Sequence, residues 1–308
     1  PRRIVPAGTH SVSTGVFRSR VENFMEGLKS IVVGLDFSDC SRAALAHAQR
    51  VASWAGAHVH PVHVVATPID EIRDDAALTA MQRGIHAGLI EDARKRWDSF
   101  VEGIPEASRL HLEVAVAHRL VGIRHQLDRH SADLPVLGAY GDERPKVGMG
   151  TLASACVRSV QTDVLIVRDT YRDPFHTVVA GIDFSSTSRR ALEMAALIAH
   201  GEGAKLYAAH IVPDHAETYA RLRTGLGPEL DAFVNETRCK YPGLEMHPKV
   251  FPYSGYRSGV LEFAALVNAD LVAVGTRGRS NLRDVVLGST AEKILRDSVC
   301  AVLAVKPR

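Results

Sequence analysis

A segment near the C-terminal end of the sequence combines glycines, hydroxyl side chains and arginines in a spacing that suits an anion. Two of its glycines carry no Cβ, so backbone N–H groups there can approach phosphate oxygens closely. A Gly-Ser-Thr sequence then opens a predicted helix, where free N–H groups and the helix dipole favour negative charge. Two arginines add positive charge beside it. The residues are Gly275, Arg277, Gly278, Arg279, Gly288, Ser289 and Thr290.

A second set of polar groups is predicted at the ends of two neighbouring strands. Asp183 follows the apolar run 178–182, and its carboxylate could accept hydrogen bonds from a ribose hydroxyl or an adenine amino group. Ile211 lies at the end of the next predicted strand, where its main chain could read an adenine edge. Asp183 could instead cap the turn that follows it. Its position favours the ligand interpretation, because open α/β sheets bind ligands at the carboxyl ends of their strands.

The elements that must position these residues occur twice in the chain. Residues 31–38 recur as 178–185, and residues 132–138 recur as 269–275 after a shorter middle segment. Such self-similarity indicates a duplicated domain. We expect a tail over 1–29, one domain over 30–170 and a second over 175–308.

Each copy alternates short β-branched or leucine-rich runs with helical patterns, which predicts two tandem α/β domains with doubly wound parallel sheets. Serines at the helix starts should act as N-caps. Residues 214–243 are assigned only as a variable segment, whereas the amphipathic helix over 79–100 is expected to pack on the core rather than to form a lid or partner surface. The strands are predicted at 31–35, 58–65, 110–117, 134–138 and 163–167, and again at 178–182, 205–212, 245–251, 271–275 and 300–305.

The second copy resembles the universal stress protein family, whose nucleotide-binding members share glycine, two residues, glycine, nine residues, glycine and then serine or threonine. Gly275, Gly278, Gly288 and Ser289 keep that spacing. The resemblance covers both halves and implies an adenine nucleotide α-hydrolase-like fold and ATP, with Mg²⁺ as a companion ion. It implies that Asp183 and Ile211 contact the adenosine part. It also implies that the phosphates are surrounded by Val274, Gly275, Arg277, Gly278, Gly288, Ser289 and Thr290.

The first copy departs from this pattern. Its loop from Gly138 to Gly150 is one residue shorter, and Asp142 and Glu143 replace Arg279 and Ser280. Acidic groups close to a polyphosphate would cost on the order of a kcal/mol per contact. We therefore expect an asymmetric pair, with ATP in the second copy and a structural or regulatory role for the first.

Hydrolysis would require a general base, and Asp183 is the only obvious candidate. The expected function is therefore a stress-response binding and signalling module that hydrolyses ATP slowly at most. The alternatives are an ATP-consuming transferase or pyrophosphatase, and a structural protein whose sites stay empty. No motif in the sequence indicates which stress is sensed or which protein is the downstream partner.

Composition narrows the partners and the location. A net charge of +2 argues against nucleic acid, and no apolar run reaches the roughly 20 residues of a membrane span. The four cysteines are scattered, so a reducing compartment such as the cytoplasm is expected. The arginines of residues 1–20 superficially suit a transit peptide, although a surface tail is favoured because no apolar signal core accompanies them.

Histidines are frequent in the first copy. His58 and His60 alternate onto one strand face and His118 and His125 flank a helix start, which allows a zinc site between strands. Surface histidines without a metal are favoured, because no compact ligand spacing is present. His63 and its counterpart in the second copy are expected to bond a neighbouring backbone group rather than to act in catalysis.

The last strand of each copy is short and hydrophobic, and such an edge invites strand pairing. The resemblance implies pairing of two domains about a two-fold axis. Here this pairing could be satisfied inside one chain, and the resulting pair could associate further into a homodimer.

Overall fold

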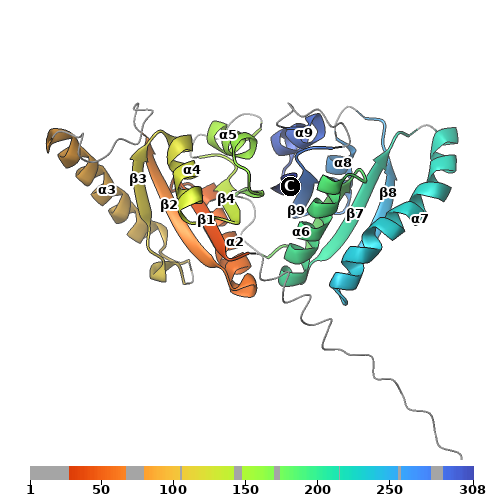
Figure 1. The fold of residues 1–308 in the computed structure, drawn as a ribbon, viewed down its shortest axis with the longest axis horizontal. Helices are drawn as coiled ribbons and strands as arrows, with labels where there is room; N and C mark the ends of the chain where they lie inside the picture. The colour runs from red at the N-terminus through yellow and green to blue at the C-terminus, as the bar shows by residue number, and fades with distance from the viewer. Residues whose placement is uncertain are drawn as a thin grey trace, which may run out of the picture.

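We describe a computed structural model of the chain. The residues described below are 28–66, 80–104, 106–141, 148–169, 174–214, 216–255, 258–278 and 287–308. Within these ranges strands and helices alternate along both halves, as Figure 1 shows. No helix of these ranges combines the length and the apolar character that a bilayer crossing requires.

The described residues of the first half form five strands, which confirms the predicted alternation. Trp97 of the long helix α3 is buried in the core, as expected for a packing helix. The elements are β1 (Ser30–Leu35), α2 (Asp39–Ala55), β2 (His58–Ala66), α3 (Ala80–Phe100), a short 3-10 turn (Ala107–Arg109), β3 (Glu113–Ala117), α4 (Arg119–Arg129), β4 (Leu134–Gly138), α5 (Thr151–Ser159) and β5 (Val164–Val167).

The second half repeats this order and includes one helix, α7, that the sequence did not predict. Most of the segment assigned as variable forms α7, which contains Pro228 and buries Leu230, Phe233 and Val234. The elements are β6 (Thr177–Ile182), α6 (Ser186–Glu202), β7 (Lys205–Val212), α7 (Ala216–Lys240), β8 (Met246–Pro252), α8 (Gly259–Leu266), β9 (Leu271–Gly275), α9 (Ser289–Asp297) and β10 (Ala301–Val305).

All the strands join in one ten-stranded sheet of order β3-β2-β1-β4-β5-β10-β9-β6-β7-β8. Pairing is parallel within each half, and β5 pairs antiparallel with β10 where the halves meet. The expected pairing of the last strands is therefore present inside the chain. Strand order reverses between β1 and β4 and again between β6 and β9, so each half has its own switch point for ligand binding.

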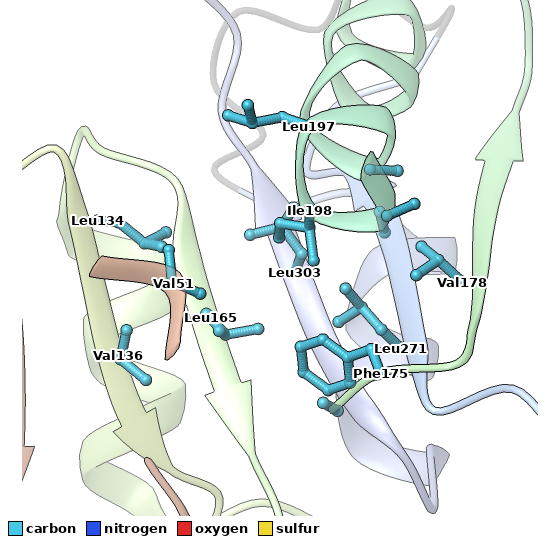
Figure 2. Close-up of a cluster of buried hydrophobic side chains, with 14 of the residues drawn as sticks. Val51, Leu134, Val136, Leu165, Phe175, Val178, Leu197, Ile198, Leu271 and Leu303 are labelled. Carbon is cyan, nitrogen blue, oxygen red and sulfur yellow. The ribbon is translucent and has the colours of Figure 1, made fainter. Parts of the chain in front are cut away.

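Two buried clusters fill the space between the sheet and its helices, and each contains residues from both halves. Figure 2 shows side chains of one cluster at the junction, where Leu165 of β5 lies near Leu303 of β10 and both are fully buried. Phe175, in the connection between the halves, fills the same cluster. The duplicated domains thus share their hydrophobic cores.

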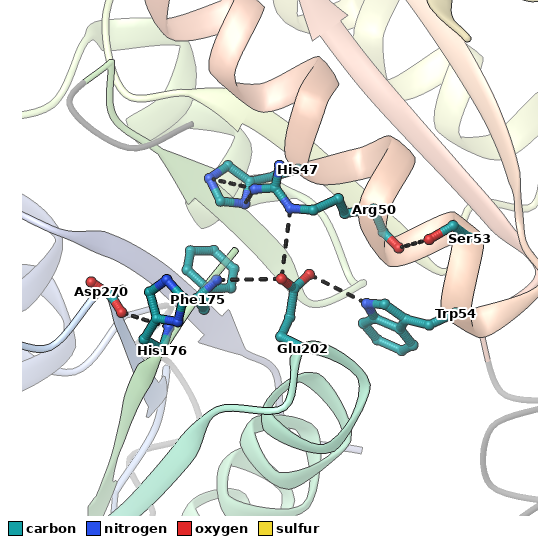
Figure 3. A network of polar contacts seen from close by, with 8 residues as sticks. All are labelled: His47, Arg50, Ser53, Trp54, Phe175, His176, Glu202 and Asp270. Atoms are coloured by element: carbon teal, nitrogen blue, oxygen red, sulfur yellow. Dashed lines mark hydrogen bonds and ion pairs between the residues drawn. The ribbon is translucent and has the colours of Figure 1, made fainter. Parts of the chain in front are cut away.

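A buried carboxylate ties the two halves together at the surface of this core (Figure 3). Glu202, the last residue of α6, accepts hydrogen bonds from Trp54 Nε1 of α2 and from the backbone N–H of Phe175, both at 3.3 Å. Arg50 Nε of α2 lies 3.6 Å from the same carboxylate. His47 stacks on the Phe175 ring with centroids 4.4 Å apart. Helices from both domains therefore share one polar network.

Candidate functional site

Asp183 lies directly after β6, in a tight turn that the structure holds in place. Its Oδ1 accepts hydrogen bonds from Ser185 N at 3.0 Å and Ser185 Oγ at 2.6 Å. Phe184 between them has a positive φ of 62°, which is uncommon for a bulky residue. The first half repeats the turn, with Asp36 Oδ1 accepting from Ser38 N at 3.0 Å. One carboxylate oxygen therefore caps the turn, the alternative that the sequence left open.

The other oxygen of Asp183 faces the glycine-rich loop. A Cβ at Gly278 would lie only 2.7 Å from Asp183 Oδ2, so a side chain at this position would force Asp183 or the loop to shift. The first half has the same arrangement, because a Cβ at Gly141 would lie 2.7 Å from Asp36 Oδ2. The structure thus brings the predicted carboxylate and the predicted loop glycine into direct proximity at the switch point.

Packing provides a reason for glycine at position 275 that the sequence did not predict. A Cβ there would lie 2.8 Å from Thr187 Cγ2 in the first turn of α6, and in the first half a Cβ at Gly138 would lie 2.8 Å from Cys40 Cβ. The missing side chain lets the strand end pack against the helix start. Close approach of a phosphate is therefore not needed to explain glycine at this position.

Backbone hydrogen bonds close the base of the loop. Gly288 N donates to Thr276 O at 2.8 Å, and Thr276 N donates to Val305 O of β10 at 2.7 Å. Gly288 is also the N-cap residue of α9 and offers no capping side chain, while Ser289 and Thr290 of the first turn are exposed. The first-turn N–H groups of α9 thus begin beside the loop, where an anion could accept from them.

The remaining predicted residues lie around the same edge. Ile211 is the penultimate residue of β7 and lies next to the end of β6, since Ile182 and His210 are paired in register. Its half-buried side chain packs against Gly259. Val274 is buried in β9, so only its main chain could reach a ligand. Arg277 is exposed, and Arg279 lies outside the described residues.

His63 and His210 hold the strand ends, as predicted. His210 Nδ1 lies 2.8 Å from Ile182 O, and His63 Nδ1 lies 2.8 Å from Leu35 O. Because a carbonyl oxygen only accepts, Nδ1 carries the proton in both rings. The ring of His210 also packs on Phe184 at a centroid distance of 4.6 Å. Burial lowers the pKa of His63, which keeps that ring neutral near pH 7.

The loop of the first half has the same base and different side chains. Gly150 N donates to Ala139 O at 2.7 Å, which repeats the contact that closes the second loop. Tyr140 occupies the place of Arg277, and its hydroxyl donates to Asp169 Oδ1 at 2.6 Å. The acidic Asp142 and Glu143 lie outside the described residues. At the position that can be compared, an exposed cation in the second half is replaced by a neutral ring.

The histidines of the first half gather differently from the zinc arrangement that we considered. His118 is the exposed N-cap residue of α4 and His125 is exposed on that helix. His60 instead lies close to Glu113 and His130. No spacing of residues predicts this trio, because strand pairing and the end of α4 bring distant positions together.

The sequence profile of the universal stress protein family matches residues 27–168 and 174–306. The chain belongs to the universal stress protein family. This finding confirms the family and the tandem arrangement that the motif spacing indicated.

Several universal stress proteins resemble this one over one or both domains. One from Bacillus subtilis is 29% identical over 148 residues, which make up 43% of this chain and 99% of that protein. One from Mycobacterium tuberculosis is 26% identical over 311 residues, covering 90% of this chain and 94% of that protein. The crystal structure of one from Archaeoglobus fulgidus has a TM-score of 0.61 at 18% identity, covering 90% of this chain and 98% of that chain. The structural likeness supports the predicted α/β fold.

Proposed function

We propose that this universal stress protein binds ATP in its second domain, residues 175–308, and acts as a regulatory module of the stress response. The observation that carries the proposal is the meeting of Asp183, Gly278 and the start of α9 at one switch point. The carboxylate can accept from the nucleoside, while loop and helix N–H groups can donate to phosphates. Mg²⁺ would accompany the phosphates.

The difference between the two loops supports a single nucleotide site. Arg277 is exposed where the first domain has Tyr140, which is engaged with Asp169. The shorter first loop also contains Asp142 and Glu143, which would repel a polyphosphate. In this proposal the first domain supports the second one or regulates it.

The fixed position of Asp183 supports binding rather than rapid turnover. Its Oδ1 already accepts two hydrogen bonds from Ser185, so this oxygen is engaged in the turn. A general base must accept a proton in the transition state. We expect slow hydrolysis at most. A cytoplasmic location and further association of two chains into a homodimer also remain part of the proposal.

Two matched glycine variants test the site. Gly278→Ala places a methyl group against Asp183, and Gly141→Ala places one at the same distance from Asp36. Equilibrium dialysis of the full chain should find one ATP bound per wild-type chain. Gly278→Ala should weaken the affinity for ATP at least about tenfold, or 1.4 kcal/mol, and Gly141→Ala should leave it unchanged.

Three results would contradict the proposal. They are the absence of ATP binding, two equivalent sites per chain, and equal losses in the two variants. Circular dichroism of both variants distinguishes a local change from unfolding. Mass spectrometry of gently denatured protein, with adenine nucleotide released from the wild type, provides an independent measurement.

A further inference from the structure

Three side chains from different elements of the first domain converge on one point. His60 belongs to β2, Glu113 begins β3 and His130 is the C-cap residue of α4. One nitrogen or oxygen atom of each lies within 4.8 Å of the others. Within the trio, His130 Nε2 lies 2.7 Å from Glu113 Oε1. Two imidazoles and one carboxylate are the protein ligands of many zinc sites.

The two imidazoles are held face to face. Their ring centroids are 3.9 Å apart and their planes differ by 22°. His130 Nε2 is shielded from solvent, and none of its contacts has the alignment of a hydrogen bond, although Glu113 Oε1 is close. The carboxylate oxygen therefore lies to the side of the N–H direction of His130 Nε2. Two ligands that share one metal ion also lie beside each other in this way.

Arg129 fixes the orientation of the carboxylate. Its Nη1 donates to Glu113 Oε2 at 2.9 Å, and the other oxygen is thereby directed toward His130. Glu113 would then act as a ligand through Oε1 alone. The three candidate ligands are all half-buried, and a tetrahedral zinc site would have a fourth coordination position beside them.

We propose that His60, Glu113 and His130 bind a divalent cation of the zinc class. Zinc bonds of about 2.0–2.2 Å in a tetrahedron place ligand atoms about 3.4 Å apart, so small side-chain rotations suffice from the observed separations. The ion would tie β2 and β3 to the C-terminal end of α4. A water molecule would complete the tetrahedron.

The second domain provides an internal comparison. Tyr207, Lys249 and Val267 occupy the places of His60, Glu113 and His130, as strand register and the helix C-caps indicate. None of the three can replace its counterpart as a ligand, and the exposed lysine would repel a cation. The proposed site therefore belongs to the first domain only.

The location also separates this site from the proposed nucleotide site. Glu113 is the first residue of β3 and His130 ends α4, so the trio lies toward the amino ends of the strands. The glycine loops follow the carboxyl ends. Metal binding and ATP binding can thus be tested independently of each other.

The test is a zinc titration of the full chain after removal of any purification tag and treatment with a chelator. Calorimetry and elemental analysis should find one zinc per chain. Glu113→Gln, His60→Ala and His130→Ala should each weaken binding at least about tenfold, because even outer groups of metal sites have effects of that size. Cobalt(II) should give visible absorption bands in the wild type that Glu113→Gln removes.

His247→Ala is the matched control. His247 in the second domain lies 2.9 Å from Glu245, and the centroids of its ring and that of Tyr207 are 5.1 Å apart. Among the described residues this histidine–glutamate pair has no third metal ligand within reach. This variant should bind zinc as the wild type does. The proposal fails if the wild type binds no zinc at micromolar protein concentration, or if His247→Ala loses as much affinity as the trio variants. Glu113→Gln keeps the size of the side chain, and circular dichroism establishes that it folds.

Discussion

Tyr140 and Arg277 occupy the same place in the two glycine loops and give these loops different electrostatic character. The tyrosine hydroxyl is engaged by Asp169, whereas the guanidinium of Arg277 is exposed at the loop of the second domain. The backbone contacts below both residues are the same, since Gly150 and Gly288 close their loops in the same way. Single side chains on a shared backbone therefore give the two loops different charge at this position.

Thiol reactivity provides a prediction at the scale of the residue. Burial raises the pKa of the Cys156 thiol to about 12 and also raises the pKa of Cys40 and Cys300, whereas Cys239 is exposed on α7. Since the thiolate is the reactive form, only Cys239 should react rapidly with a disulfide reagent at pH 8. All four should react once guanidinium unfolds the chain.

Cys239→Ser is the control for this experiment and should abolish the rapid phase. Raising the pH to 9 should leave the three buried thiols slow, because their pKa values are raised by burial. Rapid reaction of two or more thiols in the native protein would show that the core opens more readily than the packing implies.

Residue types predicted that the glycine-rich loop lies beside Asp183, because the signals for both are local in sequence. Gly278 and Asp183 were both assigned, and the structure places them against each other. The packing of Gly275 was not predicted, since its close neighbour is Thr187 of a helix that lies far away in sequence. The trio around Glu113 was missed for the same reason. Contacts made by tertiary packing leave no spacing signal in a single sequence.

The helices that follow the first strand of each domain begin with the same cap. Ser38 Oγ accepts from Ser41 N at 3.2 Å, and Ser185 Oγ accepts from Ser188 N at 3.1 Å. Both helices end at glycines with positive φ, Gly56 at 70° and Gly203 at 69°. These start and stop signals are local, which explains why the sequence predicted α2 and α6 closely.

Removing the caps gives a prediction at the scale of the element. Ser38→Ala should lower the free energy of unfolding by about 1 kcal/mol, the usual effect of losing a side-chain cap. Ser185→Ala should cost more, because the same hydroxyl also donates to Asp183 Oδ1 at 2.6 Å and hydrogen bonds to ions are stronger.

Urea unfolding of both variants measures the two effects. Ser186→Ala is the control, because Ser186 is exposed at the next position and is not the cap residue. An equal loss in all three variants, or a larger loss in Ser38→Ala than in Ser185→Ala, would contradict the assigned roles.

Helix α7 shows where local signals fail. Gly225, Gly227 and Pro228 disfavour a helix interior, and they hid the helical pattern of the segment. Tertiary packing overrides these preferences, because Leu230, Phe233 and Val234 are buried against the rest of the domain. The ring of Phe233 also meets Phe184 edge to face at 5.4 Å. An unpredicted helix thus supports the turn that positions Asp183.

At the scale of the whole molecule, the two duplicated domains form one continuous sheet with shared hydrophobic clusters. Leu165 of β5 and Leu303 of β10 are neighbours in a continuous sheet, so the hydrophobic clusters run through both domains. A buried ion pair adds a link, with Arg190 Nη2 of α6 lying 2.9 Å from Asp163 Oδ2. Asp163 Oδ1 also accepts from Lys306 N at 2.7 Å. Neither half could retain these contacts alone, and we expect cooperative unfolding.

Glu202 allows this expectation to be tested. Its side chain is 2% exposed and contacts Arg50, Trp54 and Phe175, so Glu202→Ala removes three links and leaves a partly buried arginine without that carboxylate. The variant should lower the free energy of unfolding by about 1–3 kcal/mol. Urea unfolding followed by tryptophan fluorescence and by circular dichroism should give coincident transitions in the wild type, as two-state unfolding requires.

The control is Glu91→Ala on α3, where Glu91 and Lys95 form an ion pair with both side chains 67% exposed. That variant should unfold at the same urea concentration as the wild type, because solvent screens such exposed ion pairs. In Glu202→Ala both probes should shift together to lower urea concentration, since weakening a shared interface destabilises both domains at once. Separate fluorescence and circular dichroism transitions in the wild type would instead mean that the halves unfold independently, and the shared core would then contribute little to the stability of either one.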